Sequence, residues 1–304
     1  MFRALPHPRI RKLSILPVLP LLAAPGLALA DPGTLDKARQ SGAITVAYRE
    51  SSIPFSYLGG DGKPTGFGWE ICNKIVEQVK VATGRKDLKV NSQPVTSQNR
   101  IPLLQNGTVD IECGSTTNNS ERNKQVGFAI NYFYTGTRFI TKASSGLKSV
   151  EDLKGRKVVS TVGTTNFQVL RRLNAERGLD LDLIGAKDHA ESLLLVEHGR
   201  ADAFGMDDVL LYGLRASAKD PAALAIFGDP IRVEPYAIML RKDDAPFKAL
   251  VDRVLTGLIR SGEFEQLYKK WFQSPIPPHN INLNAPMSAE LQANLKALSD
   301  KPTF

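Results

Sequence analysis

Metal sites, nucleotide sites and nucleophilic active sites depend on motifs that are missing from this sequence. Its 304 residues include only two cysteines and four histidines, and these do not have the spacing of zinc ligands. The sequence also contains no phosphate-binding G-x-x-x-x-G-K-[ST] motif and no G-x-S-x-G nucleophile motif. We therefore expect no metal, no other cofactor and no catalytic residue.

Long hydrophobic runs are absent beyond the N-terminus, where one short run follows a group of basic residues. The basic residues are Arg3, Arg9, Arg11 and Lys12, the apolar run covers about residues 13–27, and Ala28-Leu29-Ala30 precedes Asp31. This order is typical of a secretory signal peptide, so we predict that residues 1–30 are removed on secretion. A membrane anchor is the alternative, but the run is short and contains three prolines.

The net charge of the chain is small once the predicted signal peptide is removed. The full chain has 39 basic and 31 acidic residues, and removal of four basic residues leaves 35 against 31, a net charge of +4. This excess is too small to indicate nucleic-acid binding, and it is compatible with small anionic ligands. The remaining residues, about 270, exceed the usual size of one hydrophobic core, which predicts two lobes.

Strands and helices alternate along the chain in two successive runs, as in an α/β fold. In the first run we predict strands at 43–49, 89–94 and 109–113, and helices at 70–81 and 101–105. In the second we predict strands at 157–161, 182–184 and 201–206, and helices at 166–177, at 188–198 and after Asp208. An extended segment at 236–241, helices at 245–261 and 263–272, and a surface strap from Ser274 with a helix at 289–298 complete the pattern.

A cluster of hydroxyl and basic side chains follows the predicted strand 109–113. Ser115 and Thr117 supply hydroxyl groups at the carboxyl end of that strand, where open α/β sheets bind ligands. The guanidinium group of Arg122 can bind a carboxylate there through two parallel hydrogen bonds. The residues alone also allow a second interpretation, a polar loop followed by a surface arginine.

The two cysteines both lie on predicted apolar faces. Cys72 belongs to the apolar stripe of the helix 70–81, and Cys113 shares a strand face with Val109 and Ile111. If that helix packs on that strand, the two sulfur atoms can meet and form a disulfide in an oxidising compartment. Two buried free thiols are the alternative.

Several longer motifs carry a resemblance to a known family. They are Tyr48-Arg49-Glu50-Ser51, PFSY at 54–57, TSQNRIPLLQNGT at 96–108, ECGSTTNN at 112–119, AKDH at 186–189, MDD at 206–208, LRKDD at 240–244 and SPIPP at 274–278. With the Ser-x-Thr-then-Arg pattern, they resemble the periplasmic amino-acid-binding proteins of ABC importers, solute-binding protein family 3. Within that family they are most similar to the glutamate/aspartate-binding branch, and the resemblance covers essentially the whole mature chain.

The resemblance implies a periplasmic-binding-protein-like type II fold, in which two α/β lobes are joined by two extended hinge crossings. It places residues 31–135 and 237–304 in the first lobe and residues 136–236 in the second. The crossings are then expected near Tyr134 and Glu234. Composition and periodicity alone do not predict this connectivity.

The resemblance also assigns residues to the α-carboxylate that every amino acid carries. It implies that this carboxylate is bound by Arg122, Ser115 and Thr117 from the first lobe. Backbone N–H groups at Thr164 and Thr165, which precede a predicted helix, would reach the same carboxylate from the second lobe. By itself, Gly-Thr-Thr before a helix is also an ordinary N-cap.

The ammonium group and the side chain of an acidic ligand need further partners. The resemblance implies that Asp207 binds the ammonium group; Asp208 is its competitor, which we instead expect to cap the following helix. Three basic side chains and one hydroxyl are implied for the side-chain carboxylate: Arg49, Arg100, His189 and Ser97.

The expected function is a receptor that binds L-glutamate or L-aspartate between two lobes and delivers it to a membrane ABC permease. We expect a monomer in the periplasm that binds no nucleic acid. Glutamine would leave buried arginines unpaired, so acidic ligands should bind at least about 100-fold more tightly, whereas the sequence does not rank glutamate against aspartate. Three alternatives stay open: a receptor for a neutral or basic amino acid, a periplasmic enzyme such as a dehydratase on the same scaffold, and the sensing part of a signalling protein.

Overall fold

The computed structural model of the protein describes residues 1, 2, 4 and 33–303. The predicted signal peptide, residues 1–30, lies outside the described residues except for positions 1, 2 and 4. Residues 33–303 belong to one folded unit. Within the part of the chain described, no helix has the length and apolarity needed to cross a membrane.

A nine-stranded sheet forms the centre of the folded unit. Its order is β5-β1-β6-β12-β7-β10-β8-β9, and β11 pairs with β7 off this path. The strands are β1 (Ala43–Tyr48), β5 (Lys89–Pro94), β6 (Ile111–Glu112), β7 (Gly127–Lys142), β8 (Lys157–Thr161), β9 (Asp182–Ala186), β10 (Ala203–Asp207), β11 (Leu224–Phe227) and β12 (Val233–Leu240). Strands β5, β1 and β6 are parallel, as are β10, β8 and β9, and β7 and β12 run antiparallel to their neighbours.

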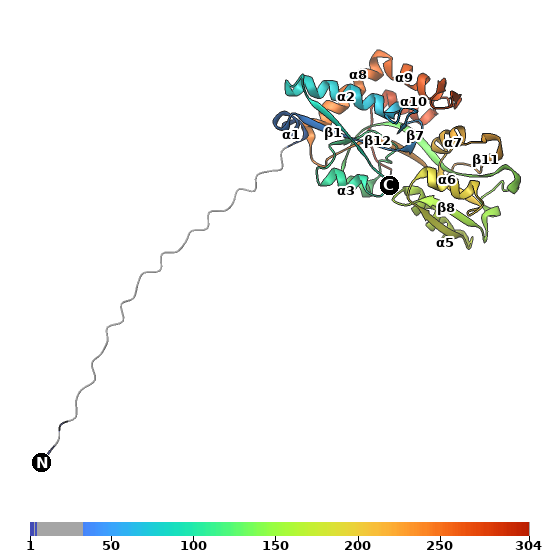
Figure 1. Ribbon diagram of the computed structural model, residues 1–304, viewed down its shortest axis with the longest axis horizontal. Helices are drawn as coiled ribbons and strands as arrows, with labels where there is room; N and C mark the ends of the chain where they lie inside the picture. Colours follow the sequence, from blue (N-terminus) through green and yellow to red (C-terminus); the bar gives the residue numbers. More distant parts are fainter. Residues whose placement is uncertain (3, 5–32, 304) are drawn as a thin grey trace. The chain divides into compact units, whose positions relative to one another are not determined.

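Strand β7 lies in the middle of the sheet, between β12 and β10. It thereby joins two α/β lobes (Figure 1). Its first part pairs with β12, from Gly127 opposite Leu240 to Gly136 opposite Val233. Its later part pairs with β10 and β11 of the second lobe. Pro235 lies opposite Tyr134, so the two crossings expected near 134 and 234 are adjacent antiparallel segments.

Helices surround each lobe. The first lobe carries α1 (Thr34–Ser41), α2 (Phe67–Thr83), α3 (Arg100–Gln105), α4 (Ser120–Asn123), α8 (Ala245–Ser261), α9 (Glu263–Phe272) and α10 (Ala289–Ala297). The second carries α5 (Thr165–Arg177), α6 (His189–Glu197) and α7 (Asp208–Ser217), with short 3-10 turns at Ala143–Ser145, Glu151–Leu153 and Pro221–Ala223. Two small sheets complete the fold: β2 (Ser51–Ser52), β3 (Ser56–Leu58) and β4 (Pro64–Thr65), and β13 (Pro275–Ile276) with β14 (Ile281–Asn282).

An aromatic cluster fixes the two crossings to the helices of the first lobe. The buried ring of Phe55 lies 4.9 Å from that of Phe133 in β7 and 5.2 Å from that of Tyr236 in β12, measured between ring centroids. The same ring lies 6.2 Å from Phe67 in α2 and 5.5 Å from Phe272 in α9. Edge-to-face aromatic pairs of this kind stabilise a core by about 0.5–1.5 kcal/mol each beyond their buried area. The crossings are therefore anchored at the first lobe by packing.

Most predicted elements occur in the structure, and several have the predicted bounds. Strands 89–94 and 157–161 and helices 245–261 and 263–272 are confirmed to the residue as β5, β8, α8 and α9. The predicted strand 109–113 was too long, because only Ile111 and Glu112 pair with β1. The predicted helix 289–298 was one residue too long, because Leu298 takes a left-handed conformation with φ of 51°. Helix α1, the two small sheets, β11 and the full length of β7 were not predicted.

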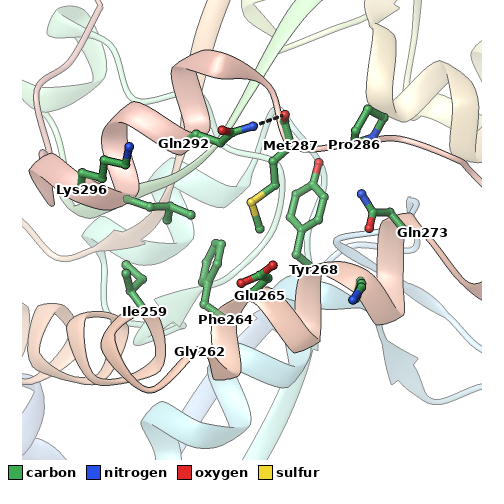
Figure 2. Close-up of a pocket in the computed structure, with 12 residues that line it drawn as sticks. Ile259, Gly262, Phe264, Glu265, Tyr268, Gln273, Pro286, Met287, Gln292 and Lys296 are labelled. Atoms are coloured by element: carbon green, nitrogen blue, oxygen red, sulfur yellow. Dashed lines mark hydrogen bonds between the residues drawn. The ribbon is translucent and has the colours of Figure 1, made fainter.

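A groove separates helix α10 from helix α9 (Figure 2). It measures about 580 Å³ and is lined by Phe264 and Tyr268 from α9 and by Met287 and Gln292 on the opposite side. Helix α10 instead makes contacts with β7. Helix α10 is thus held to the sheet through β7.

A disulfide joins Cys72 in α2 to Cys113, which follows β6. The two Cα atoms lie 5.8 Å apart, and both cysteines are buried. The predicted pairing is confirmed, and the alternative of two free thiols is wrong. The bond closes a loop of 41 residues and attaches α2 to the strand that precedes the predicted anion-binding loop.

Removal of this disulfide should lower the stability of the protein without changing its fold. A cross-link across 41 residues restricts the unfolded chain, and we expect Cys72→Ala/Cys113→Ala to lose about 3–4 kcal/mol in the free energy of unfolding. Urea titration of the oxidised protein and the variant measures this loss. Reductant should shift the wild-type midpoint and leave that of the variant unchanged; equal midpoints for the oxidised protein and the variant would contradict the prediction.

Candidate functional site

A small cavity of about 10 Å³ collects side chains from both lobes. The first lobe contributes Ser97, Arg100, Ser115, Thr117 and Arg122, and the second contributes Thr164, Thr165, Asn166, His189, Met206, Asp207 and Leu210. Nine of the ten residues predicted to bind ligand therefore line one cavity. The tenth, Arg49, contacts two of them.

The loop after β6 places the guanidinium group of Arg122 between the lobes. Asn119 caps helix α4 by accepting a hydrogen bond of 2.9 Å from the backbone N–H of Arg122. The Arg122 side chain donates to the carbonyl oxygen of Thr117 at 3.0 Å and to that of Gly163, in the second lobe, at 3.2 Å. Burial, followed by the charge of Arg100, lowers the pKa of Arg122 to about 9. A ligand carboxylate would relieve both effects.

Residues 163–165 of the second lobe meet this loop from the opposite side. Thr164 is the N-cap of α5: its hydroxyl accepts from the N–H of Phe167 at 3.1 Å and donates to the carbonyl of Thr161 at 2.6 Å. Its side chain is thus already hydrogen-bonded, as the N-cap alternative predicted. The hydroxyl of Thr165 lies 3.3 Å from that of Thr117 in the first lobe.

Gly163 allows the two lobes to approach each other closely. Its φ is 79°, a conformation that favours glycine, and a Cβ atom here would lie 2.6 Å from the Cα of Gln98. Any other residue would therefore push the second lobe away from the loop that carries Ser97.

The opposite end of the site is strongly basic. Arg49 and Arg100 are each 2% exposed, and one Nη2 of Arg49 donates to the Ser97 hydroxyl at 2.8 Å. The same atom lies 3.3 Å from Nε2 of His189. Burial, followed by the charges of Arg49 and Arg100, holds the pKa of His189 well below its usual value, so the imidazole is neutral at pH 7.

The neutral imidazole has one defined tautomer. Because arginine can only donate, Nε2 of His189 accepts from Arg49, and Nδ1 carries the proton. Nδ1 lies 2.9 Å from the hydroxyl oxygen of Thr161, to which it donates. The second lobe thus holds the ring in position against the arginine of the first.

Asp207 is the carboxylate of the cavity. It is the last residue of β10, where it pairs with Thr137 of β7, and it is 4% exposed. Its Oδ2 accepts a hydrogen bond from the hydroxyl of Tyr236. Burial, followed by the charge of Glu234, raises the pKa of Asp207 to about 7. Asp208 does not line the cavity: it accepts from the Thr135 hydroxyl at 2.6 Å and from the N–H of Val209 at 2.7 Å.

Buried polar atoms without hydrogen-bond partners occur on both sides of the site. Among residues 33–303 they include Nη1 of Arg49, Nε of Arg100 and Oδ1 of Asp207. Such atoms are costly unless a partner reaches them. The arrangement suits a solute with negative groups near the first lobe and a positive group near Asp207.

Sequence reasoning missed several residues of the site and its surroundings. Asn166, Met206 and Leu210 line the cavity. Glu112 is fully buried in β6, and its Oε2 accepts from the Thr116 hydroxyl at 2.6 Å. The alternation of residues 109–113 predicted that Glu112 faces solvent. Glu112 lies only a few residues before Ser115 of the predicted anion site. That position was the available signal that its side chain faces inward.

Two α/β lobes joined by adjacent crossings, with a polar cavity lined from both, define a solute-binding protein. Residues 44–274 match the profile of the bacterial extracellular solute-binding proteins, family 3, so the chain belongs to that family. It is 50% identical over 285 residues to the L-glutamate/L-aspartate-binding protein of Pseudomonas aeruginosa, covering 93% of this chain and 94% of the relative. It is 48% identical over 299 residues to the glutamate/aspartate import solute-binding protein of Salmonella typhimurium, covering 96% and 99%.

Solved structures share the fold at lower sequence identity. An ArgBP mutant from T. maritima superposes with a TM-score of 0.71 at 25% identity, covering 79% of this chain and 99% of that one. An ancestral arginine-binding protein bound to glutamine superposes with a TM-score of 0.67 at 28% identity, covering 76% and 98%. These neighbours confirm the predicted type II fold of periplasmic amino-acid-binding proteins.

The raised pKa of Asp207 predicts a pH-dependent stability for the free protein. Between about pH 4 and pH 7 the folded state holds a proton that the unfolded state has lost, so this group's contribution to stability is lost as the pH rises. His189 acts in the opposite direction below about pH 6.5, because its lowered pKa gives the folded state fewer protons.

Comparison with Asp207→Asn isolates the carboxylate from the imidazole. The free energy of unfolding of the wild type, relative to that of the variant, should fall by up to about 4 kcal/mol from pH 4 to pH 8. Denaturant titrations of both proteins across this range measure the difference. A difference that is the same at every pH would contradict the prediction.

Proposed function

We propose that the protein is an extracytoplasmic receptor that binds L-glutamate or L-aspartate and delivers it to an ABC permease. The observation that carries the proposal is the distribution of charge around the cavity. Arg100 and Arg122 line it from the first lobe and Asp207 lines it from the second, while Arg49 contacts the lining residue His189. The names of the two relatives, both glutamate/aspartate-binding proteins of similar length, support the same ligands.

An acidic amino acid matches this distribution group by group. Its α-carboxylate would be bound by Arg122 with the hydroxyls of Ser115 and Thr117, and by the backbone N–H groups at the start of α5. Its ammonium group would pair with Oδ1 of Asp207, which is buried without a hydrogen-bond partner among residues 33–303. A buried pair of this kind repays the cost of desolvating both groups only where its geometry is good and its remaining hydrogen bonds are made.

The second carboxylate would lie at the basic end of the site. Arg49 and Arg100 each have a buried N–H group without a partner in the described part of the chain, and Ser97 and neutral His189 lie beside Arg49. A neutral imidazole next to two arginines leaves the site with less excess charge than an imidazolium would. The side-chain carboxylate of the ligand would then offset the repulsion between Arg49 and Arg100.

Binding would be coupled to closure of the two lobes, which we place at residues 31–135 with 237–304 and at residues 136–236. Ligand partners come from both lobes, so the ligand favours the closed form by the contacts that only that form makes. Direct contacts across the cavity, between Arg122 and Gly163 and between Arg49 and His189, would add to closure. The permease would recognise the closed form.

We further propose that the protein acts in the periplasm and does not catalyse a reaction on its ligand. Residues 1–30 would be removed as a signal peptide, releasing a monomer into the periplasm. Asp207, the carboxylate that lines the cavity, would be paired with the ligand's ammonium group and so would not act as a base. Recovery of chemically unchanged ligand from the purified complex would support a receptor over an enzyme.

Calorimetry on protein stripped of bound amino acid tests the proposal. We expect one site with micromolar or tighter affinity for glutamate or aspartate, about −8 kcal/mol or stronger. Arg122→Ala should abolish binding, because it removes the charge partner of the α-carboxylate. Arg171→Ala, which removes an exposed arginine of α5, is the matched control and should bind as the wild type does. Absence of heat with both ligands in the wild type would reject the proposed function.

A further inference from the structure

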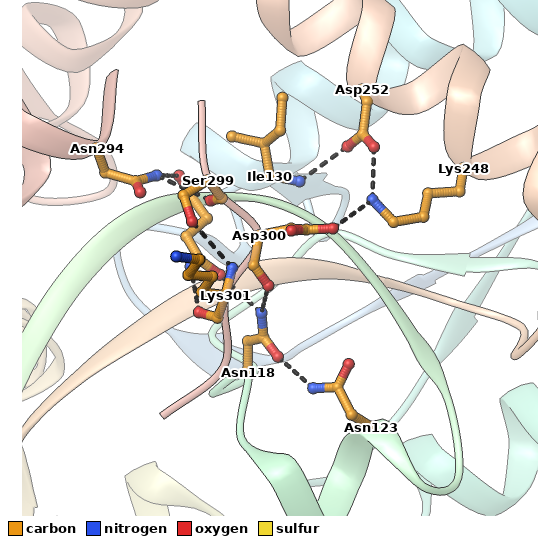
Figure 3. Close-up of polar contacts among 10 residues, drawn as sticks. Asn118, Asn123, Ile130, Lys248, Asp252, Asn294, Ser299, Asp300 and Lys301 are labelled. Carbon is orange, nitrogen blue, oxygen red and sulfur yellow. Dashed lines mark hydrogen bonds and ion pairs between the residues drawn. The ribbon is translucent and has the colours of Figure 1, made fainter. Parts of the chain in front are cut away.

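The last ten described residues, 294–303, cross the back of the loop that carries Ser115, Thr117 and Arg122; we call them the C-terminal strap. Figure 3 shows that the strap meets this loop through a group of asparagine side chains. Three of these asparagines are buried: Asn118 and Asn131 are 0% exposed and Asn294 is 6% exposed. Buried amides are costly unless hydrogen-bonded, so the extent of their pairing indicates how firmly they are held.

Asn118 follows Thr117 directly, and each of its polar groups has a partner. Its side-chain nitrogen donates to Oδ1 of Asn131 and to the carbonyl of Asp300, both at 2.8 Å. Its side-chain oxygen accepts from Asn123 at 2.5 Å. Its backbone N–H donates to the carbonyl of Pro235, in the second crossing, at 2.9 Å. Asn118 therefore links the loop, β7, the strap and a crossing.

The strap also pairs with the loop through its backbone. The N–H of Thr303 donates to the carbonyl of Asn118 at 3.2 Å, and the N–H of Ser120 donates to the carbonyl of Thr303 at 2.9 Å. Asn119, whose side chain caps α4 and orients Arg122, forms a parallel bridge with Thr303. The strap thus adds a short strand to the segment that carries the cap.

Asn131 and Asn294 hold the strap in this register. The side chain of Asn294 donates to the carbonyl of Asn131 at 2.7 Å, and that of Asn131 donates to the carbonyl of Lys301 at 2.9 Å. At the strap's outer edge, Lys248 forms ion pairs with Asp252 at 2.6 Å and with Asp300 at 2.8 Å. Asp252 also accepts from the N–H of Ile130 in β7, at 2.8 Å.

We propose that the C-terminal strap positions Ser115, Thr117 and Arg122, which we call the α-carboxylate clamp. Asn118 and Asn294 are positioning residues that do not contact the ligand. The inference rests on the proposed function of Ser115, Thr117 and Arg122. The loop is hydrogen-bonded on its other side to the second crossing, through Ala237 and Thr116 at 3.1 Å. Held between the crossing and the strap, the loop keeps the guanidinium and hydroxyl groups in place before the ligand arrives.

The proposal predicts a loss of order in the loop when the strap is released. Asn294→Ala removes the amide that fixes the strap to β7, far from the cavity in sequence. Asn118→Ala removes the link between the strap and the loop itself. The matched control is Gln292→Ala, which removes an exposed amide on the same helix that donates only to the carbonyl of Met287, at 3.0 Å.

Two measurements on the full mature chain test the proposal. Hydrogen exchange of the free protein, in peptides covering residues 115–123, should become faster in Asn294→Ala and Asn118→Ala and stay unchanged in Gln292→Ala. Calorimetry at 25 °C should show weaker binding in the two strap variants by about 10-fold, which corresponds to 1.4 kcal/mol. The factor should be the same for glutamate and aspartate, because they share the α-carboxylate.

The outcomes separate this inference from the proposed function. If the strap variants melt at lower temperature but keep wild-type affinity and wild-type exchange in residues 115–123, the strap is merely structural and the inference is overturned. If Asn118→Ala does not fold, Asn294→Ala decides the question. If the wild type does not bind either acidic amino acid, the proposed function fails, and faster exchange in the loop alone decides whether the strap positions it.

Discussion

Buried charged groups whose hydrogen bonds are incomplete among residues 33–303 are the constraint on which the rest of this structure depends. Arg49, Arg100 and Arg122 lie on one side of a small cavity and Asp207 on the other, all at most 7% exposed. Burial lowers the pKa of Arg49 and of Arg122 to about 9 and raises that of Asp207 to about 7, so each charged form is costly where it stands. A ligand with complementary charges would stabilise the charged forms of these groups, and this stabilisation would contribute to its affinity.

The scaffold holds these charges in place against their mutual repulsion. The aromatic cluster around Phe55 fixes both crossings to the first lobe, the disulfide joins α2 to the end of β6, and the C-terminal strap covers the back of the clamp loop. Each of these elements meets the segment 113–122 or the crossings beside it. The fold therefore concentrates its cross-links around the loop that carries Ser115, Thr117 and Arg122 of the cavity lining.

Many helices and strands of this fold can be predicted from local sequence. Which distant residues meet in the cavity cannot. Helices 245–261 and 263–272 were predictable because their amphipathic patterns start at Asp244 and break at Gly262. The cluster Ser115, Thr117 and Arg122 was recognisable because it directly follows a strand. Periodicity, however, does not say which strand ends meet, so the approach of Arg49 to His189 came only from the family resemblance. The role of Asn118 was not predictable, because its partner Asp300 lies 182 residues away.

We expect the cavity to select its ligand by the number of carboxylates that the ligand carries. Glutamine has nearly the shape of glutamate but would leave buried arginine N–H groups without a charged partner. Competitive calorimetry of the stripped wild-type protein with glutamate and glutamine is therefore the most direct test. We expect glutamate to bind at least about 100-fold more tightly than glutamine. Equal affinities for the two amino acids would contradict it.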